Sequence, residues 1–422
     1  MLNQDVGLFS MWLNAHYVIF IYNNTKLIIK IGKVLSMIKV KMYQASQGDA
    51  FLISIPSRKI NIVVDMGLKG TYLNHIKPDL INLKVSGQCI DLLVVTHVDN
   101  DHIVGAVNFI KDNGSNDEVI EVKEVWYNCY RHLQFLKQDK ALDQDERDAL
   151  QQICSQNRYL EEKKGLEDIQ IEQGVTLAGL LYGYNYSWND KFDGYAVISK
   201  RKVIEISAGL TLRIVSPNKE KLNALSTKWK EKLESEKYDF TLNEEKIFDD
   251  AFEQYMKMPE FQSEIKDVAQ SNEHCFSELL NLEGSDTSIT NGSSIAFIIE
   301  FENRKLLFLG DAHEDVIYDE LSSLKDDGYD LDFEIVKVSH HGSNNNISNR
   351  LLKLISSKRF LISTNGSHSH PDLSAIAKII SNSQWSTIIT NYQHEKLKFF
   401  ENYKSVRDGK VTFITANEIM VE

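Results

Sequence analysis

The sequence predicts an α/β protein built from layered β-sheets. Three observations support this fold class: short apolar runs alternate with polar turns from Met37 onward, several runs end in a polar or charged residue, and helical segments lie between and after them. Side chains at strand ends often carry the chemistry of such folds. The expected strands are Ala50–Ile55, Ile60–Asp65, Ile90–Thr96, Val122–Asn128, Leu210–Val215, Ser294–Phe301, Lys305–Leu309, Phe333–Ser339, Arg359–Ser363, Thr387–Thr390 and Val411–Thr415.

The composition is that of a globular protein with a large core. The 422 residues are 42% hydrophobic and 25% charged, which excludes a disordered or fibrous chain. A formal net charge of −13 argues against a protein whose whole task is to clamp nucleic acid non-specifically. The four scattered cysteines contain no CxxC pair, so we expect reduced thiols and a cytoplasmic protein.

Residues 1–36 are interpreted as an N-terminal extension, either an appended β-hairpin or a segment upstream of the true start. The alternation of Ile38, Val40 and Met42 with lysines marks the first strand of the domain that follows. Polar residues interrupt the apolar segment from Phe9 to Ile31, and no basic region precedes it. We therefore expect neither a membrane span nor a secretory signal.

Residues 37–422 are expected to form one domain with two mostly helical insertions, at about 131–200 and 219–286. The first insertion begins with a charged helical segment, Asp143–Tyr159. The second holds 17 acidic against 9 basic residues. It also contains an amphipathic helix whose apolar face is formed by Phe248, Phe252, Tyr255 and Met256. The insertions would either cap the functional site or form a peripheral, solvated pair of helices.

Four potential metal ligands follow one apolar strand directly: His97, Asp99, Asp101 and His102. The two aspartates would repel each other unless a cation lay between them. Imidazole and carboxylate ligands together suit zinc, manganese or iron rather than calcium. The cluster is therefore a predicted metal site.

Further strands also run into candidate ligands. Asp311 follows Gly310 at the end of one strand, and a two-cation site needs such a bridging carboxylate. His340 and His341 follow the next strand, and His370 follows another. One of these two histidine groups would bind metal, and the other would supply a general acid or a phosphate contact. No such role is expected for His16, His75, His132, His274, His313, His368 and His394.

Together these motifs resemble the metallo-β-lactamase superfamily. The segment from His97 to His102 is similar to its HxHxDH signature, with Asp99 in place of the second histidine. That variant resembles the hydrolase domain of ComEC-type competence proteins and their stand-alone relatives. The likeness covers most of the chain from Met37, except the two insertions. The other matching segments are Gln47-Gly48-Asp49-Ala50, Asp65, Gly310-Asp311, Ser339-His340-His341-Gly342-Ser343 and His370-Pro371.

The resemblance implies an αββα sandwich with a metal site along one sheet edge. In such a site Asp65 would orient the ligands. His341 would contact a substrate phosphate or protonate the leaving group, while His370, or alternatively His340, would complete a metal shell. Asp101 would act in catalysis as well as in metal binding. The remaining expected ligands are His97 and Asp99 for one ion, Asp101 and His102 for the other, and Asp311 as the bridge.

The sequence departs from the family pattern in two places. Asp99 makes the site more anionic, which favours manganese, or alternatively magnesium, over zinc alone. The separate third histidine of the superfamily is absent, and Asn291 and Ser293 lie where it would be. With Ser343, these two residues are predicted to bind substrate. The expected cofactors are one or two divalent cations, Mn²⁺ or Zn²⁺, with Mg²⁺ as an alternative.

The predicted function is that of a metal-dependent phosphodiesterase, most simply a nuclease in a bacterial anti-phage or DNA-processing module. It would act through a metal-activated hydroxide. Its partners would be nucleic acid or another phosphodiester and an activating protein, with no membrane partner. One alternative is a hydrolase of small esters, lactones or thioesters, because the fold does not choose among these reactions. A second alternative is a non-enzymatic metal-binding interaction module.

Overall fold

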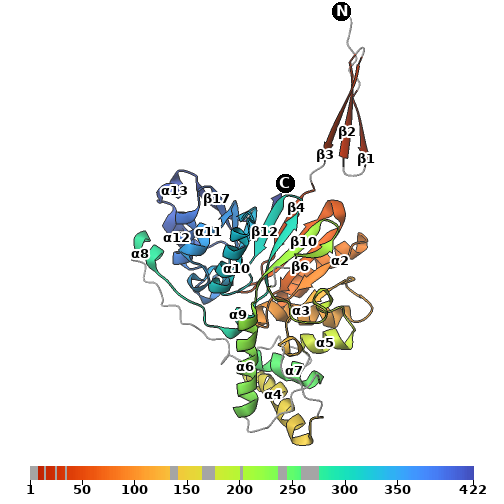
Figure 1. Ribbon diagram of the computed structural model, residues 1–422, viewed down its shortest axis with the longest axis vertical. Helices are drawn as coiled ribbons and strands as arrows, with labels where there is room; N and C mark the ends of the chain where they lie inside the picture. Colours follow the sequence, from red (N-terminus) through yellow and green to blue (C-terminus); the bar gives the residue numbers. More distant parts are fainter. Residues whose placement is uncertain are drawn as a thin grey trace, which may run out of the picture.

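The structure is a computed structural model. It describes the backbone alone for residues 8–13, 16–23, 26–33 and 155–163, and the backbone and side chains for 36–133, 141–154, 176–199, 203–235, 245–257 and 275–422. Two large sheets lie face to face, and helices cover their outer faces (Figure 1). The α/β class predicted from the alternation of strands and helices is confirmed.

The first sheet has six strands in the order β19-β4-β5-β6-β7-β8. Neighbouring strands are antiparallel from β19 to β6 and parallel from β6 to β8. Its strands are β4 (Ile38–Met42), β5 (Ala50–Ile55), β6 (Ile60–Met66), β7 (Leu92–Val94), β8 (Val125–Trp126) and β19 (Glu418–Val421).

The second sheet has eight strands in the order β18-β17-β16-β14-β12-β11-β10-β9. The pairs from β9 to β12 are antiparallel, and those from β12 to β18 are parallel. Its strands are β9 (Val203–Ser207), β10 (Leu210–Ser216), β11 (Ala296–Phe301), β12 (Arg304–Phe308), β14 (Ile335–Lys337), β16 (Arg359–Ile362), β17 (Ser386–Thr390) and β18 (Val411–Thr415).

Alternating side chains of these strands bury themselves in three separate cores. Between the two sheets, Phe51 of β5 packs edge-on against Phe308 of β12, with ring centroids 5.4 Å apart. The opposite faces of the strands pack under helices, with Leu93 in one outer core and Leu307 in the other. Three cores between four layers form the αββα sandwich, as predicted.

The helices of the two outer layers lie on opposite sides of the sheets (Figure 1). Helices α1 (Lys69–Thr71), α2 (Lys77–Val85) and α3 (Asn100–Asn113) cover the first sheet. Helices α10 (Glu314–Asp326), α11 (Asn349–Leu354), α12 (Leu373–Asn382) and α13 (Lys404–Arg407) belong to the second. Gly105 of α3 lies so close to β6 that a Cβ there would be 2.0 Å from the carbonyl oxygen of Met66.

The segments interpreted as insertions contain α4 (Gln144–Lys163), α5 (Leu177–Gly183), α6 (Lys219–Ser235), α7 (Lys246–Met256) and α8 (Phe276–Asn281). A capping box between Asp143 and Glu146 starts α4. Trp229 of α6 packs against Phe252 of α7, with ring centroids 5.7 Å apart, and both belong to the same core as α3. Helices α4 to α7 are therefore continuous with the outer layer of the first sheet rather than a detached, solvated pair.

Several elements differ from the sequence prediction in length or number. The expected strand Phe333–Ser339 is divided between β13 (Asp332–Phe333), which pairs with β15 (Ser356–Ser357), and β14. The edge strands β9 and β19 were not predicted, because they are only five and four residues long. Three further strands, β1 (Leu8–Leu13), β2 (His16–Asn23) and β3 (Lys26–Lys33), form a separate antiparallel sheet (Figure 1). Among the described residues, no helix has the length and apolar character of a membrane span.

Candidate metal centre

The predicted ligands lie where strands of both sheets end. The segment from Thr96 to His102 follows β7, Asp311 follows β12, and His340 follows β14. Two backbone hydrogen bonds hold these ends together: Ile295 donates to the carbonyl of Thr96 across the sandwich, and His340 donates to that of Gly310, at 2.9 and 3.0 Å. Residues far apart in the sequence therefore meet at one edge, as predicted.

His97 and His102 are each held through one ring nitrogen and leave the other facing inward. Nδ1 of His97 lies 3.0 Å from Oγ1 of Thr96, and Nδ1 of His102 lies 2.8 Å from Oδ2 of Asp65. Both Nε2 atoms are buried, and neither has a hydrogen-bond partner within the described part of the chain. Buried polar atoms without partners are rare in proteins, and a metal ion would satisfy both.

Asp65 holds this arrangement from behind. Its carboxylate accepts hydrogen bonds from the backbone nitrogen and the hydroxyl of Thr96, at 2.8 and 2.7 Å, in addition to its contact with His102. The residue has a φ of 53°, in the left-handed region that non-glycine residues seldom adopt. Its carboxylate thus fixes both the strand end and the imidazole, which is the geometry expected of a residue that orients a ligand.

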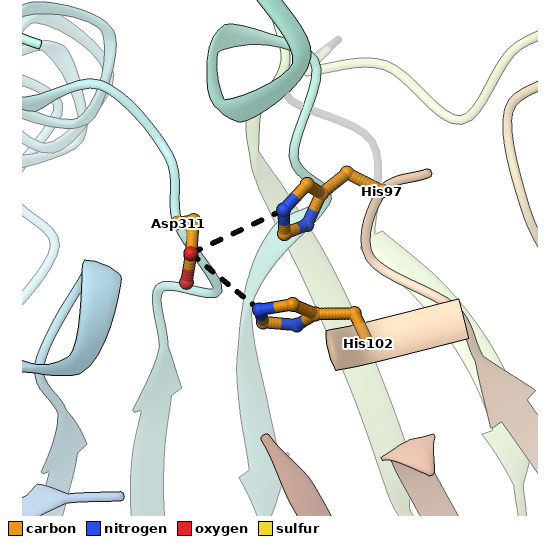
Figure 2. Close-up of side chains that lie close together, drawn as sticks. All are labelled: His97, His102 and Asp311. Carbon is orange, nitrogen blue, oxygen red and sulfur yellow. Dashed lines mark ion pairs between the residues drawn. The ribbon is translucent and has the colours of Figure 1, made fainter. Parts of the chain in front are cut away.

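One oxygen atom is the centre of the cluster. The Nε2 atoms of four histidines lie 3.5 to 4.0 Å from Oδ2 of Asp311; these are His97, His102, His340 and His341. Figure 2 shows two of these imidazoles directed at the carboxylate. Atoms that bind one cation tetrahedrally at about 2.1 Å lie about 3.4 Å apart, so the shorter distances match ligand-to-ligand edges. The residues present therefore fit a bound metal ion.

Both aspartates of the signature segment point into the same cluster. Oδ2 of Asp99 lies 3.5 Å from Nε2 of His97, and Oδ2 of Asp101 lies 3.7 Å from Nε2 of His341. Among the described residues, three groups could hold a metal ion, and all contain His102: His97–His102–Asp311, Asp101–His102–His341 and Asp49–Asp65–His102.

The turn after β14 directs two consecutive histidines into the centre. His340 and His341 both have positive φ, at 46° and 54°, and Gly342 follows at 87°. Nδ1 of His341 donates to the carbonyl oxygen of Ser363 at 2.8 Å, which leaves its Nε2 as an acceptor. His341, expected to contact substrate, belongs to one of the groups that could hold a metal ion, with Asp101 and His102.

The Nδ1 atoms of His340 and His370 each face a carboxylate. Nδ1 of His340 lies 3.3 Å from Oδ2 of Asp286 and 3.1 Å from Oδ1 of Asn346. The ring centroid of His370 is 5.2 Å from that of His340, and its Nδ1 lies 3.4 Å from Oδ1 of Asp372. His370, expected to complete a metal shell, belongs to none of the three groups of described residues that share His102.

The three residues predicted to bind substrate are buried and mostly engaged by their own loops. Asn291, in the short helix α9 (Ile289–Gly292), donates to Asp286 at 2.8 Å and lies 3.4 Å from Nδ1 of His340. The hydroxyl of Ser293 donates to the carbonyl of Thr290 at 2.6 Å. The hydroxyl of Ser343 accepts from the backbone nitrogen of Asn345 at 3.2 Å. Of the three, Asn291 is the one in contact with the cluster.

The sequence reasoning missed three members of the centre. Asp286 was included in an acidic insertion, and no local spacing distinguishes it. Asp49 lies in the Gln47-Gly48-Asp49-Ala50 motif, but the motif alone indicates no role for its side chain. Lys337 lies fully buried in an apolar strand. A lysine within an apolar strand is unusual, and this was the feature of the sequence that could have identified it. Burial would raise the pKa of Asp49, but its ion pair with Lys337 lowers it to about 2.

Buried charges shift the pKa values of several side chains in the centre. Burial alone would lower the pKa of His102, but nearby carboxylates, Asp311 foremost, raise it well above its ordinary value. Burial would also lower the pKa of His340, but the carboxylates of Asp311 and Asp286 raise it to about 9. Burial would raise the pKa of Asp311, but the imidazoles, His341 foremost, hold it well below its usual range. A divalent cation would compete with protons for the same groups.

The other histidines whose side chains the structure describes lie outside this cluster. His313 is buried and faces the carbonyl of Ser288 at 2.8 Å, so it supports the loop before α9. His132 and His394 contact backbone atoms of their own surroundings, and His75 and His368 are exposed. His274 lies outside the described residues, as does the side chain of His16.

No family model and no curated protein matches the chain. Among solved structures it is similar to a mutant form of CmlA β-hydroxylase (TM-score 0.36) and to CmlA, a diiron β-hydroxylase from Streptomyces venezuelae (TM-score 0.35). Each is 9% identical, and the match covers 93% of this chain and 55% of CmlA, so the chain spans about half of that protein. A protein of unknown function from Enterococcus faecalis V583 follows, with 8% identity, a TM-score of 0.25, and coverage of 90% and 88%. The fold described above rests on the sheet order and the three cores.

Proposed function

We propose that the chain is a divalent-metal-dependent hydrolase that cleaves phosphodiester bonds, with nucleic acid as its substrate class. The observation that carries this proposal is the convergence of four imidazole Nε2 atoms on Oδ2 of Asp311, beside Asp99 and Asp101. Such a set of nitrogen and oxygen donors suits manganese, zinc or iron.

Two ligand sets that share Asp311 would hold a pair of cations. His97 and Asp99 lie on one side, with His340 also facing the shared oxygen. The second set consists of Asp101, His102 and His341. Bound cations would lower the pKa of water from about 15.7 toward neutrality and would stabilise negative charge that develops on the substrate.

The protein's own contribution is orientation and proton transfer. Asp65 fixes the imidazole of His102, and the carbonyl of Ser363 fixes that of His341. His370 is the better candidate for the proton donor to the leaving group, because its ring lies beside the centre and Asp372 lies close to its Nδ1. This exchanges the roles first expected for His341 and His370.

Charges on the described surface support a substrate held mainly through cations. The basic pair Lys358 and Arg359 is engaged by Glu334, at 2.6 and 3.5 Å, and is not free to follow a phosphate backbone. The other basic run, at 200–202, lies outside the described residues. We therefore include an activating partner protein in the proposal, as a source of additional substrate contacts.

The direct test is cleavage of labelled single- and double-stranded DNA and RNA with Mn²⁺, Mg²⁺, Zn²⁺ or Fe²⁺. Bis-p-nitrophenyl phosphate and a panel of lactones and thioesters should be assayed in parallel. His102→Ala should abolish activity, and His75→Ala, at an exposed histidine, should leave it unchanged. We expect metal-dependent cleavage of phosphodiesters. Turnover of carboxylic esters alone would support the alternative hydrolase, and bound metal without turnover of any substrate, even with a partner protein, would support a binding module.

A further inference from the structure

A buried lysine lies against the centre. Lys337, in β14, is 1% exposed, and its Nζ donates to the carbonyl oxygen of Gly310 at 2.8 Å. The same ammonium pairs with the buried carboxylate of Asp49 and lies 3.6 Å from Oδ1 of Asp311. An isolated ammonium in an interior would be costly, so these acceptors fix where it lies.

The two oxygens of Asp311 have different surroundings. Oδ2 faces the four imidazoles, whereas Oδ1 faces Lys337 and has no hydrogen-bond partner among the described residues. The backbone of Asp311 is held as well, because its nitrogen donates to Oγ of Ser294 at 3.0 Å and Gly310 before it has a φ of 51°. With the backbone fixed, rotation of the carboxylate is the remaining freedom, and Lys337 opposes it.

We propose that Lys337, anchored by Asp49, is a positioning residue that retains Oδ1 of Asp311, so that Oδ2 alone is shared between two cations. This inference rests on the proposed metal centre. A carboxylate free to rotate could bind one cation with both oxygens. The other cation would then lose a ligand, on a side where Asn291 already stands in place of a histidine.

A role of Lys337 as a positive charge alone leads to the opposite expectation. Removal of one positive charge makes the site more anionic, and both cations would then bind more tightly. If Lys337 positions Asp311, its removal weakens the binding of the second cation. The exchange coupling between the two metal ions is then lost. The sign of the change in affinity therefore distinguishes the two roles.

The experiment is a titration of the full chain with Mn²⁺, followed by calorimetry and electron paramagnetic resonance. The wild type should bind two ions with an exchange-coupled spectrum. Lys337→Met should bind the second ion at least about tenfold more weakly. This is the size of effect typical of removing a residue that holds a metal ligand in place without binding the metal itself. Its spectrum should be that of isolated Mn²⁺. Lys337→Arg, which keeps the charge, should retain part of the coupling.

Two further variants make the result decisive. The double variant Asp49→Asn/Lys337→Met removes both members of the ion pair, so it should fold even if Lys337→Met does not, and it should also lose the coupled pair. Lys257→Met breaks another buried ion pair, to Glu253 in α7, and should leave metal binding unchanged. A coupled pair of ions, bound as tightly as in the wild type or more tightly, in Lys337→Met and in the double variant would overturn this inference and leave the proposed function intact. A wild type that binds no Mn²⁺, Zn²⁺ or Fe²⁺ would overturn both.

Discussion

Oδ2 of Asp286 lies 3.3 Å from Nδ1 of His340, just as Oδ2 of Asp65 lies 2.8 Å from Nδ1 of His102. Two histidines from different strand ends are thus each oriented by a buried carboxylate. The Asp286 carboxylate also accepts from the side chains of Asn291 and Asn346, both at 2.8 Å. It therefore links the loop before α9 to the turn after β14.

Replacement of Asp286 by asparagine should lower the pKa of His340 from its value of about 9, because a negative charge beside an imidazole favours the protonated form. The new amide would also face two amide donors, so the variant should lose about 1–3 kcal/mol of stability. Histidine proton shifts of the metal-free protein, followed by NMR from pH 5 to 10, measure the first effect. Asp112→Asn, at a half-exposed ion pair with Lys77, should leave that titration unchanged.

Metal affinity should rise with pH up to about 9. The folded pKa of His340 is raised to about 9, so its imidazole is protonated at neutral pH and must lose a proton before it binds a cation; the pKa of His102 is raised as well. Affinity should increase by about tenfold per pH unit for each proton released. Calorimetry in buffers of different ionisation enthalpy counts these protons. An affinity independent of pH between 6 and 9 would contradict this assignment.

The same linkage predicts the stability of the metal-free protein. A raised folded pKa contributes stability that is complete below the unfolded value of about 6.5 and is lost as pH rises through the folded value. The melting temperature of the metal-free protein should therefore fall between pH 6.5 and 10. Added Mn²⁺ should stabilise it most at the alkaline end, as differential scanning calorimetry would show.

His341→Ala and His370→Ala should have different effects. His341→Ala should lose bound metal, because the Nε2 atom near Asp101 and Asp311 is removed. His370→Ala should keep its metal but lose about 10²–10⁴-fold in nucleic-acid cleavage if His370 is the proton donor. Its loss on bis-p-nitrophenyl phosphate should be much smaller, since p-nitrophenolate leaves without a proton. Equal losses on both substrates would assign His370 a role other than proton transfer.

Gly105→Ala should displace the helix that carries His102. A Cβ at this position would lie 2.0 Å from the carbonyl oxygen of Met66, so α3 must move away from β6. We expect a loss of about 1–3 kcal/mol in urea unfolding, together with weaker metal binding. Gly70→Ala is the matched control, because a Cβ there would meet its nearest atom at 3.9 Å.

The sequence predicted those parts of the centre that depend on local order. His97, His102, Asp311 and His341 lie in segments that follow apolar strands, and the ends of β7, β12 and β14 meet at one edge of the two packed sheets. The roles within the turn after β14 could not be predicted, because two adjacent histidines in left-handed conformations point to different partners. Asp286 joins the centre through tertiary packing alone.

The remaining differences have similar causes. Ser293 and Ser343 were expected to bind substrate. In the structure the hydroxyl of each makes a hydrogen bond to a backbone group of its own turn, as serines in tight turns commonly do. Strand β19 has four residues, and its pairing with β4 depends on a partner from the other end of the chain. The pattern of apolar and polar residues within a few positions of β19 does not show which distant strand it pairs with.

The pairing of β19 with β4 also affects how the protein is made. Strand β4 leaves the ribosome early, yet its neighbour, Glu418–Val421, is synthesised after every other strand of the sandwich. Until then the outer edge of β4 has unpaired backbone groups that could join a strand of another nascent chain. The growing polypeptide therefore needs protection of that edge throughout translation, and a premature stop near Glu418 would yield an aggregation-prone product even though every metal ligand had been made.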